Sequence, residues 1–129
     1  MRAIDANIAI RWLTNDDPHQ AELARELLKS PAFVPLTVLI EIAWVLRRSY
    51  RFDRSMLNAA ITALVDLETI SVAPEAGVRW ALARQGAGAD LPDMLHLVAA
   101  RGADSFASFE RKLARHAGPD TPIAVEHIR

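Results

Sequence analysis

The chain has 129 residues, 51% of them hydrophobic and 24% charged, which is enough apolar surface for one ordinary domain to fold around a single core. We therefore expect one domain over residues 1–129. The formal net charge is −1 and there are no cysteines, so charge gives no sign of a nucleic-acid partner, and disulfide scaffolds, thiolate zinc sites and cysteine nucleophiles are excluded.

The predicted elements alternate between short apolar runs and amphipathic helices. Strands are predicted at residues 2–6, 32–35, 69–73, 104–108 and 122–125. Helices are predicted at residues 7–13, 18–28, 38–46, 54–65, 75–85, 91–101 and 109–116, with Asp17, Thr37, Asp53 and Asp90 at or near their starts. Strands separated by helices need crossover connections, so the order predicts a three-layer α/β/α sandwich with a short, largely parallel central sheet.

No segment of the sequence predicts a membrane protein. The longest apolar stretch, Phe33 to Leu46, is interrupted by Pro35, Thr37 and Glu41 and is too short to cross a bilayer. The first residues have neither the apolar region nor the cleavage site of a signal peptide. We therefore expect a cytoplasmic protein.

Acidic residues gather at the ends of the predicted strands, where ligands bind in open parallel sheets. They are Asp5, Glu41, Asp90, Asp93 and Glu110. Carboxylates that share a cavity repel one another by about 4 kcal/mol per close pair at an effective dielectric near 20, so they converge only around a cation or a proton. Mg²⁺ or Mn²⁺ prefers such oxygen ligands, and the chemistry that follows is metal-assisted hydrolysis of a phosphate ester.

Each acid also has a purely structural interpretation. Asp5 could cap the helix that follows it, and Asp90 with Asp93 resembles a reciprocal cap, which leaves capping and metal ligation equally open for Asp93. Glu110 would suit the first turn of a capped helix after Ser108. Glu41 is expected in the first turn of its helix and interrupts an apolar run, where an ionised carboxylate is costly unless paired or metal-bound.

Basic and aromatic residues carry weaker signals. One cluster holds Arg47, Arg48, Arg51 and Arg54, and another holds Arg111, Lys112 and Arg115. Each cluster could be a solvated helix face or a set of phosphate contacts. The three tryptophans, Trp12, Trp44 and Trp80, stand in amphipathic helices and are expected in the core.

Four segments, taken in order, resemble the PIN domain and within it the VapC-type toxin ribonucleases of toxin-antitoxin pairs. They are Ile4-Asp5-Ala6-Asn7, Leu39 to Arg47 around Glu41, Gly88 to Ala100 around Asp90 and Asp93, and Ser108-Phe109-Glu110-Arg111-Lys112-Leu113. The family's first three acids fall on Asp5, Glu41 and Asp93, with Asp90 matching a further acid often found there. The chain departs from the family at the fourth position, where Ser108-Phe109-Glu110 replaces Thr-Phe-Asp and a longer carboxylate must reach the same metal.

The resemblance implies a PIN-like fold and an Mg²⁺- or Mn²⁺-dependent endoribonuclease, a hydrolase that is usually a homodimer and is silenced by a cognate antitoxin. It implies that Asp5, Glu41 and Asp93 hold the main metal, while Asp90 and Glu110 complete the acidic cluster or bind a second metal. The Ser108 hydroxyl could orient a ligand or phosphate, and Arg47, Arg48 and Arg51 could receive RNA or the antitoxin.

Two other functions are consistent with parts of the sequence. A PIN-like module weakened at its fourth acid could serve mainly as a protein- or RNA-binding partner. A receiver-like phosphoacceptor domain also carries acids at strand ends, but the only late lysine, Lys112, falls in a predicted helix and not at a strand end.

Overall fold

Aspartate side chains start several helices by accepting hydrogen bonds from N–H groups that have no partner within the helix. In a computed structural model, which describes residues 1–129, Asp17 accepts from the backbone N–H of Gln20 (3.1 Å) and Asp53 from that of Met56 (2.8 Å). Aspartate is among the best residues for this N-cap position. The two helix starts predicted at these aspartates are confirmed.

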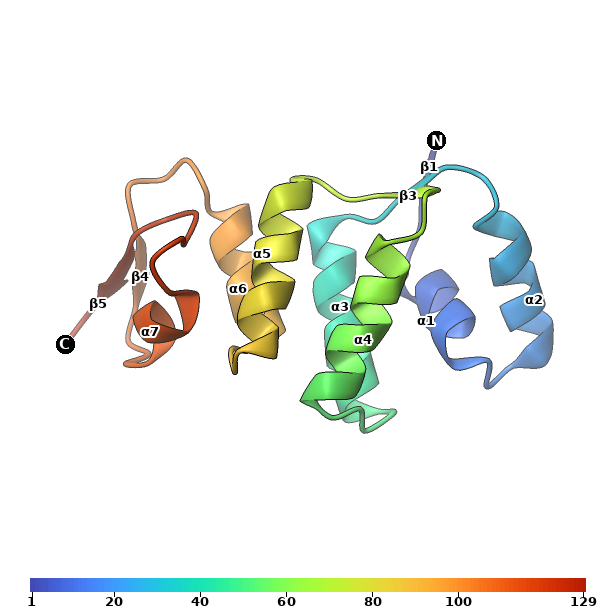
Figure 1. Ribbon diagram of the computed structural model, residues 1–129, viewed down its shortest axis with the longest axis horizontal. Helices are drawn as coiled ribbons and strands as arrows, with labels where there is room; N and C mark the ends of the chain where they lie inside the picture. The colour runs from blue at the N-terminus through green and yellow to red at the C-terminus, as the bar shows by residue number, and fades with distance from the viewer. The chain divides into compact units, whose positions relative to one another are not determined.

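The chain forms two compact units, unit 1 (Met1–Ala73) and unit 2 (Pro74–Arg129). Unit 1 holds β1 (Arg2–Ala3), α1 (Ala6–Thr14), α2 (Pro18–Leu27), β2 (Ala32–Phe33), α3 (Leu36–Arg48), α4 (Arg54–Val65) and β3 (Ile70–Ser71) (Figure 1). Unit 2 holds α5 (Glu75–Gly86), α6 (Leu91–Ala99), β4 (Phe106–Ser108), α7 (Leu113–Ala117) and β5 (Val125–His127).

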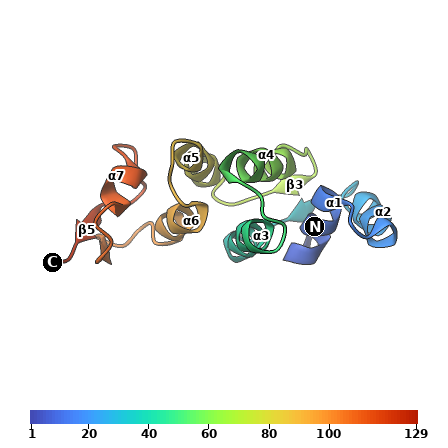
Figure 2. The ribbon, with the colours of Figure 1, turned by 90° about the horizontal axis from the view of Figure 1, so that it is seen from below.

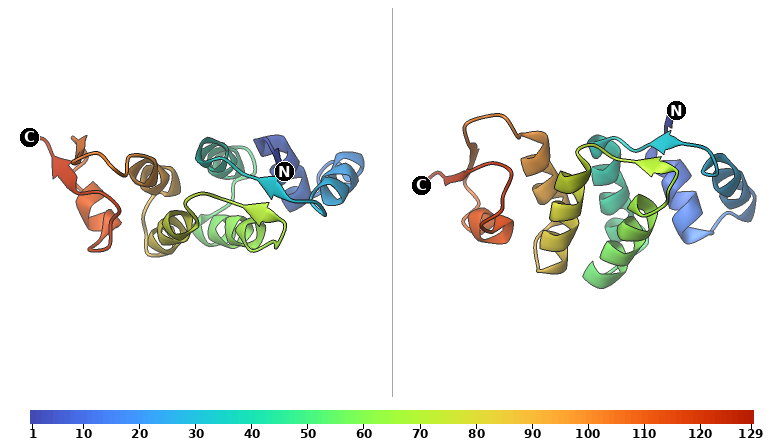
Figure 3. Two further views of the ribbon diagram at one scale, coloured as in Figure 1. Left: turned by 90° about the horizontal axis from the view of Figure 1, so that it is seen from above. Right: turned by 45° about the horizontal axis from the view of Figure 1, so that its top comes forward.

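The strands of unit 1 form a parallel sheet in the order β1-β2-β3. Figure 3 shows β2 and β3 side by side and pointing the same way. Hydrogen bonding continues past the short strands, because Ile4 N–H donates to the Phe33 carbonyl and Val34 N–H to the Ser71 carbonyl, both at 3.0 Å. Each pair of neighbouring strands is joined by two helices, as parallel pairing requires.

Apolar side chains of the helices make the core of unit 1. Helix α1 packs against α2 and α3, and α3 packs against α4, which Figure 2 shows nearly end on. The largest fully buried side chains of this unit are Ile10, Leu39, Ile42, Leu46, Leu57, Ile61 and Leu64. They recur at helical spacing, which is why the amphipathic pattern predicted these helices.

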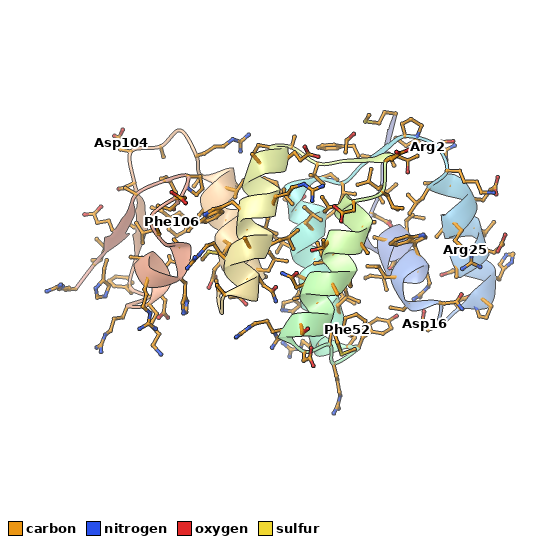
Figure 4. The ribbon with its side chains drawn as sticks, viewed as in Figure 1. Arg2, Asp16, Arg25, Phe52, Asp104 and Phe106 are labelled. Atoms are coloured by element: carbon orange, nitrogen blue, oxygen red, sulfur yellow. The ribbon has the colours of Figure 1, made fainter.

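A polar network ties two loops of unit 1 together. The Tyr50 hydroxyl donates to Asp16 Oδ2 (2.6 Å), and Arg11 donates to both Asp16 Oδ1 and the Tyr50 oxygen, each at 3.2 Å. The hydroxyl of Thr14 also donates to Asp16 Oδ1 (2.9 Å). Asp16, labelled in Figure 4, therefore links the loop between α1 and α2 to the loop between α3 and α4.

In unit 2, a small residue allows two helices to approach closely. A Cβ atom on Gly77 of α5 would lie 2.8 Å from Val98 Cγ1 of α6, closer than real Cβ contacts occur. The two helices pack side by side, as Figure 2 shows. Farther along the chain, β4 and β5 pair in parallel with Ser108 opposite His127.

The α/β class and the parallel direction of every strand pair are confirmed, with differences in detail. The strands are shorter than predicted and pair as one three-stranded sheet in unit 1 and one two-stranded ladder in unit 2. Pro35, not Thr37, is the N-cap residue of α3. Helix α7 begins at Leu113 instead of residue 109, because residues 109–112 form a turn, and β5 lies three residues beyond the predicted start. None of the seven helices is both long enough and apolar enough to span a membrane.

Candidate functional site

Asp5 stands where the first strand gives way to the first helix. Its Oδ1 atom accepts a hydrogen bond from Ile8 N–H (3.3 Å), so the capping role that the sequence left open is confirmed. The other carboxylate oxygen has no partner and the residue is exposed. Asp5 also lines a cavity of about 290 Å³ beside α1 and α2, together with Arg11 and Leu23. Capping therefore leaves Asp5 able to bind a ligand.

Glu41 differs from its prediction in two respects. It lies in the second turn of α3 and not in the first, because the helix already begins at Leu36. Glu41 is exposed, while Leu39, Ile42 and Ala43 around it are fully buried. The expectation that its carboxylate lies among apolar side chains is therefore wrong. Its carboxylate makes no hydrogen bond or ion pair. The apolar run reflects one buried helix face, and Glu41 lies on the other.

The two acids at the start of α6 differ in role, because one caps the helix and the other does not. Asp90 is the N-cap residue, and its Oδ2 accepts from Asp93 N–H (3.1 Å). The Asp93 carboxylate does not accept a hydrogen bond from the Asp90 N–H, so the reciprocal cap does not form. The Asp93 side chain has no hydrogen-bond partner. Asp90 thus uses one carboxylate oxygen for capping, as Asp5 does, whereas both oxygens of Asp93 are free to bind a ligand.

The pKa of Asp93 shows that three predicted acids of unit 2 influence one another. Asp93 is exposed, but neighbouring parts of the chain keep some water from its carboxylate. This partial desolvation raises the pKa of Asp93 above its ordinary value of 3.8, and the negative charges of Asp90 and Glu110 raise it further. His96 and His116 oppose this rise. A cation near Asp93 would offset the negative charge of these acids.

Glu110 lies in the turn that follows β4, three residues before α7, and not in the first turn of a helix as predicted. Its N–H donates to Ser108 Oγ (3.0 Å), and its Oε1 accepts from Lys112 N–H (3.2 Å). The Ser108 hydroxyl therefore accepts within the turn and keeps its own proton to donate. Asp104, labelled in Figure 4, precedes β4 and so lies at the opposite end of that strand from Glu110.

The predicted arginine cluster is exposed at the end of α3 and in the loop after it. Arg47 and Arg48 occupy the last turn of the helix, and Arg51 adopts a left-handed backbone with φ of 56°. The Arg48 guanidinium stacks over Trp44 at 4.9 Å from the ring centroid. Trp44 is 55% exposed, so its expected place in the core is wrong.

A cavity that the sequence does not predict lies beside Glu110. This cavity, of about 720 Å³, is lined by Phe109, Glu110, Arg111, His127 and Arg129. Phe109 was expected to begin a helix, and the last strand was predicted to end before His127. The signal that could have found these residues is their position just after two parallel strands.

The donor chemistry of these acids fits a hard divalent cation, although no group of three or more Asp, Glu or His side chains is gathered closely enough to form a metal site by itself. The predicted ligands come from both units. Asp5 and Glu41 belong to unit 1, whereas Asp90, Asp93 and Glu110 belong to unit 2. Free carboxylate oxygens on Asp5, Glu41 and Asp93 are the ligand type that Mg²⁺ and Mn²⁺ prefer.

A comparison with protein families identifies the class of protein. The PIN domain family model matches residues 3–119, which is nearly the whole chain. The chain therefore belongs to the PIN domain family, and the predicted PIN-like α/β/α fold is confirmed. Among curated proteins, none matches this sequence. PIN domains are generally nucleases that use divalent metals.

Proposed function

We propose that this protein is an Mg²⁺- or Mn²⁺-dependent endoribonuclease and the toxin of a type II toxin-antitoxin pair. The observation that carries the proposal is the unpaired Asp93 carboxylate, whose pKa is raised first by desolvation and then by the charges of Asp90 and Glu110, in a chain of the PIN domain family. A carboxylate with free oxygens and other acids near it can bind a divalent cation, and membership of the PIN domain family indicates the class of reaction. The VapC-type resemblance of the four segments supports the toxin role.

In this proposal Asp5, Glu41 and Asp93 hold one ion, while Asp90 and Glu110 complete the cluster or bind a second. The bound ion would lower the pKa of an attacking water and offset charge on the phosphodiester. Other residues of the protein bind the substrate or the antitoxin. The Ser108 hydroxyl donates to a phosphate oxygen, and Arg47, Arg48 and Arg51 receive the RNA backbone or the antitoxin.

The partners follow from the same proposal. A homodimer is proposed from the family resemblance. An antitoxin segment would silence the enzyme by covering Asp5, and the cavity beside α1 and α2 offers a place for it. Leu23, which is 57% exposed, and Leu27 can pack against apolar side chains of that segment.

The test is cleavage of a panel of labelled structured RNAs with Mg²⁺ or Mn²⁺, with and without EDTA. The chain offers a matched pair of variants, Asp5→Asn and Asp53→Asn. Both aspartates are N-caps that accept an N–H from three residues on, and asparagine caps equally well. Only Asp5 is a proposed ligand.

We expect Asp5→Asn to lose metal-dependent cleavage by on the order of a hundredfold or more, since loss of even an outer-shell partner costs roughly 10- to 100-fold. Asp53→Asn should cleave like the wild type, and both variants should keep the wild-type Tm in EDTA. Equal activity in Asp5→Asn and Asp53→Asn would refute Asp5 as a ligand. Cleavage that persists in EDTA would refute the metal dependence.

One observation favours a second function. The Glu110 carboxylate is held by Lys112 N–H in its own turn, which competes with reaching a metal. The chain would then be a weakened PIN module that serves mainly as a binding partner. Glu110→Asp separates the two, because it restores the aspartate of the family's Thr-Phe-Asp pattern at this position. Cleavage that appears or rises strongly in Glu110→Asp would support the weakened module, and a large loss of cleavage in Glu110→Asp would support Glu110 as a working ligand.

A further inference from the structure

The cavity after β4 and β5 combines a bare aromatic ring with unpaired positive charge. Phe109 is 81% exposed, the highest value among the large apolar side chains of the chain. Arg111 and Arg129 line the same cavity and make no hydrogen bond or ion pair. An exposed ring costs free energy in water unless a partner covers it.

The pairing of two strands builds this cavity. Ser108 is opposite His127 in the parallel ladder, and Ile128 N–H donates to the Ser108 carbonyl (2.8 Å). Residues 109–111 and residue 129 therefore leave the ladder at the same end, the carboxyl end, where ligands of parallel sheets bind. The volume of about 720 Å³ falls in the range of ligand pockets, roughly 300–1,000 Å³.

We infer that this cavity binds one nucleotide of single-stranded RNA, with the base stacked on Phe109 and the flanking phosphates held by Arg111 and Arg129. Aromatic platforms beside arginines recognise unpaired bases because every base has a flat face and every linkage has a negative charge. The two arginines outweigh the single carboxylate of Glu110 in the cavity lining. His127 adds a ring nitrogen that can hydrogen-bond a base edge or a phosphate.

The position of the cavity makes the inference specific. Glu110 lines it and is a proposed metal ligand, so a nucleotide held there would lie beside the proposed reaction centre. The inference rests on the proposed ribonuclease function and deepens it, because it states that the enzyme takes its substrate unpaired. A duplex cannot offer a free base face to Phe109.

The test separates binding from cleavage. Fluorescein-labelled single-stranded and duplex RNA of one sequence are titrated with the full chain in EDTA, and binding is followed by anisotropy. The variants are Phe109→Tyr, Phe109→Leu, Arg111→Gln and Lys112→Gln. Lys112 neighbours Arg111 and is exposed but does not line the cavity, so it is the matched control for loss of one positive charge.

We expect single-stranded RNA to bind more tightly than duplex RNA. Phe109→Leu should weaken it by about tenfold, the fold-change expected for one lost base stack, while Phe109→Tyr keeps the affinity. Arg111→Gln should weaken binding and lower the slope of log affinity against log salt by about 0.7, the loss of one phosphate contact. Lys112→Gln should change neither value.

Several outcomes would overturn the subsite. They are equal binding by Phe109→Leu and the wild type, equal losses in Arg111→Gln and Lys112→Gln, and no binding of single-stranded RNA. Retained binding by Phe109→Leu in a protein that cleaves RNA would refute the subsite and leave the proposed nuclease standing. The expected binding pattern in a protein that never cleaves RNA would refute the nuclease and leave the subsite standing. Melting curves check that each variant is folded.

Discussion

At the scale of single residues, capping and metal binding make separate demands on the same carboxylates. An N-cap uses one carboxylate oxygen and leaves the other free, as at Asp5. Asp93 differs because its carboxylate contributes no hydrogen bond at all, although it carries a cost from partial desolvation and from two neighbouring acids. A charged group that weakens the folded state and has no structural partner is typical of a functional position.

This cost predicts that Asp93→Asn stabilises the protein in EDTA. Because the folded pKa of Asp93 lies above its unfolded value, the folded state binds the proton more tightly, and ionisation costs stability. The cost is absent below the unfolded pKa and complete above the folded pKa. Wild type and Asp93→Asn should therefore melt alike in acid, and the variant should have the higher Tm at neutral pH.

Asp104→Asn is the control for this comparison, because Asp104 is an exposed acid without a hydrogen bond or ion pair. Its Tm should follow the wild type at every pH. A lower Tm for Asp93→Asn at neutral pH would show that Asp93 supports the fold through its charge and would contradict the raised pKa.

At the scale of elements, the end of α7 depends on a glycine and an arginine. Gly118 is the C-cap residue, with φ of 76° and ψ of −173°, a backbone region that only glycine adopts readily. Arg84 of α5 donates through Nε to the His116 carbonyl (2.7 Å). A Cβ on Gly118 would lie 3.1 Å from Arg84 Cζ, so the conformation and the contact both oppose a larger residue.

Gly118→Ala should therefore lower the free energy of unfolding by about 1–3 kcal/mol for backbone strain, with an added steric cost. Gly102→Ala is the matched control, because Gly102 also has a positive φ (97°) but nothing lies within 4 Å of its Cβ position. Urea unfolding of both variants, repeated in an Arg84→Ala background, separates the cost of backbone strain from the cost of the steric contact with Arg84. If Arg84→Ala leaves the cost of Gly118→Ala unchanged, the contact contributes nothing.

Elements set by local chemistry could be predicted from the sequence, whereas those set by distant contacts could not. Asp17, Asp53 and Asp90 cap helices where the sequence placed them, because a cap needs only the next three residues. The exposure of Glu41 and Trp44 depends on which face of α3 the rest of unit 1 covers, and the apolar run around them does not reveal that. Phe109 was missed for the same reason, since the turn before α7 depends on the pairing of β4 with β5.

At the scale of the whole molecule, the proposed metal ligands come from both units. Asp5 and Glu41 come from Met1–Ala73, while Asp93 and Glu110 come from Pro74–Arg129. The PIN domain family match spans residues of both units. If a single ion uses ligands from both units, its binding must depend on each unit at once.

This dependence predicts how Mn²⁺ changes the stability of three variants. A ligand that binds only the folded state stabilises it by RT ln(1 + [L]/Kd), about 2.7 kcal/mol at a concentration one hundred times Kd. The wild-type Tm should rise with Mn²⁺ and return with EDTA. Asp5→Asn in unit 1 and Asp93→Asn in unit 2 should each lose most of this rise, while Asp53→Asn keeps it. If Asp5→Asn and Asp93→Asn each lose only part of the rise, and the double variant loses all of it, the two units bind separate ions and the shared site is wrong.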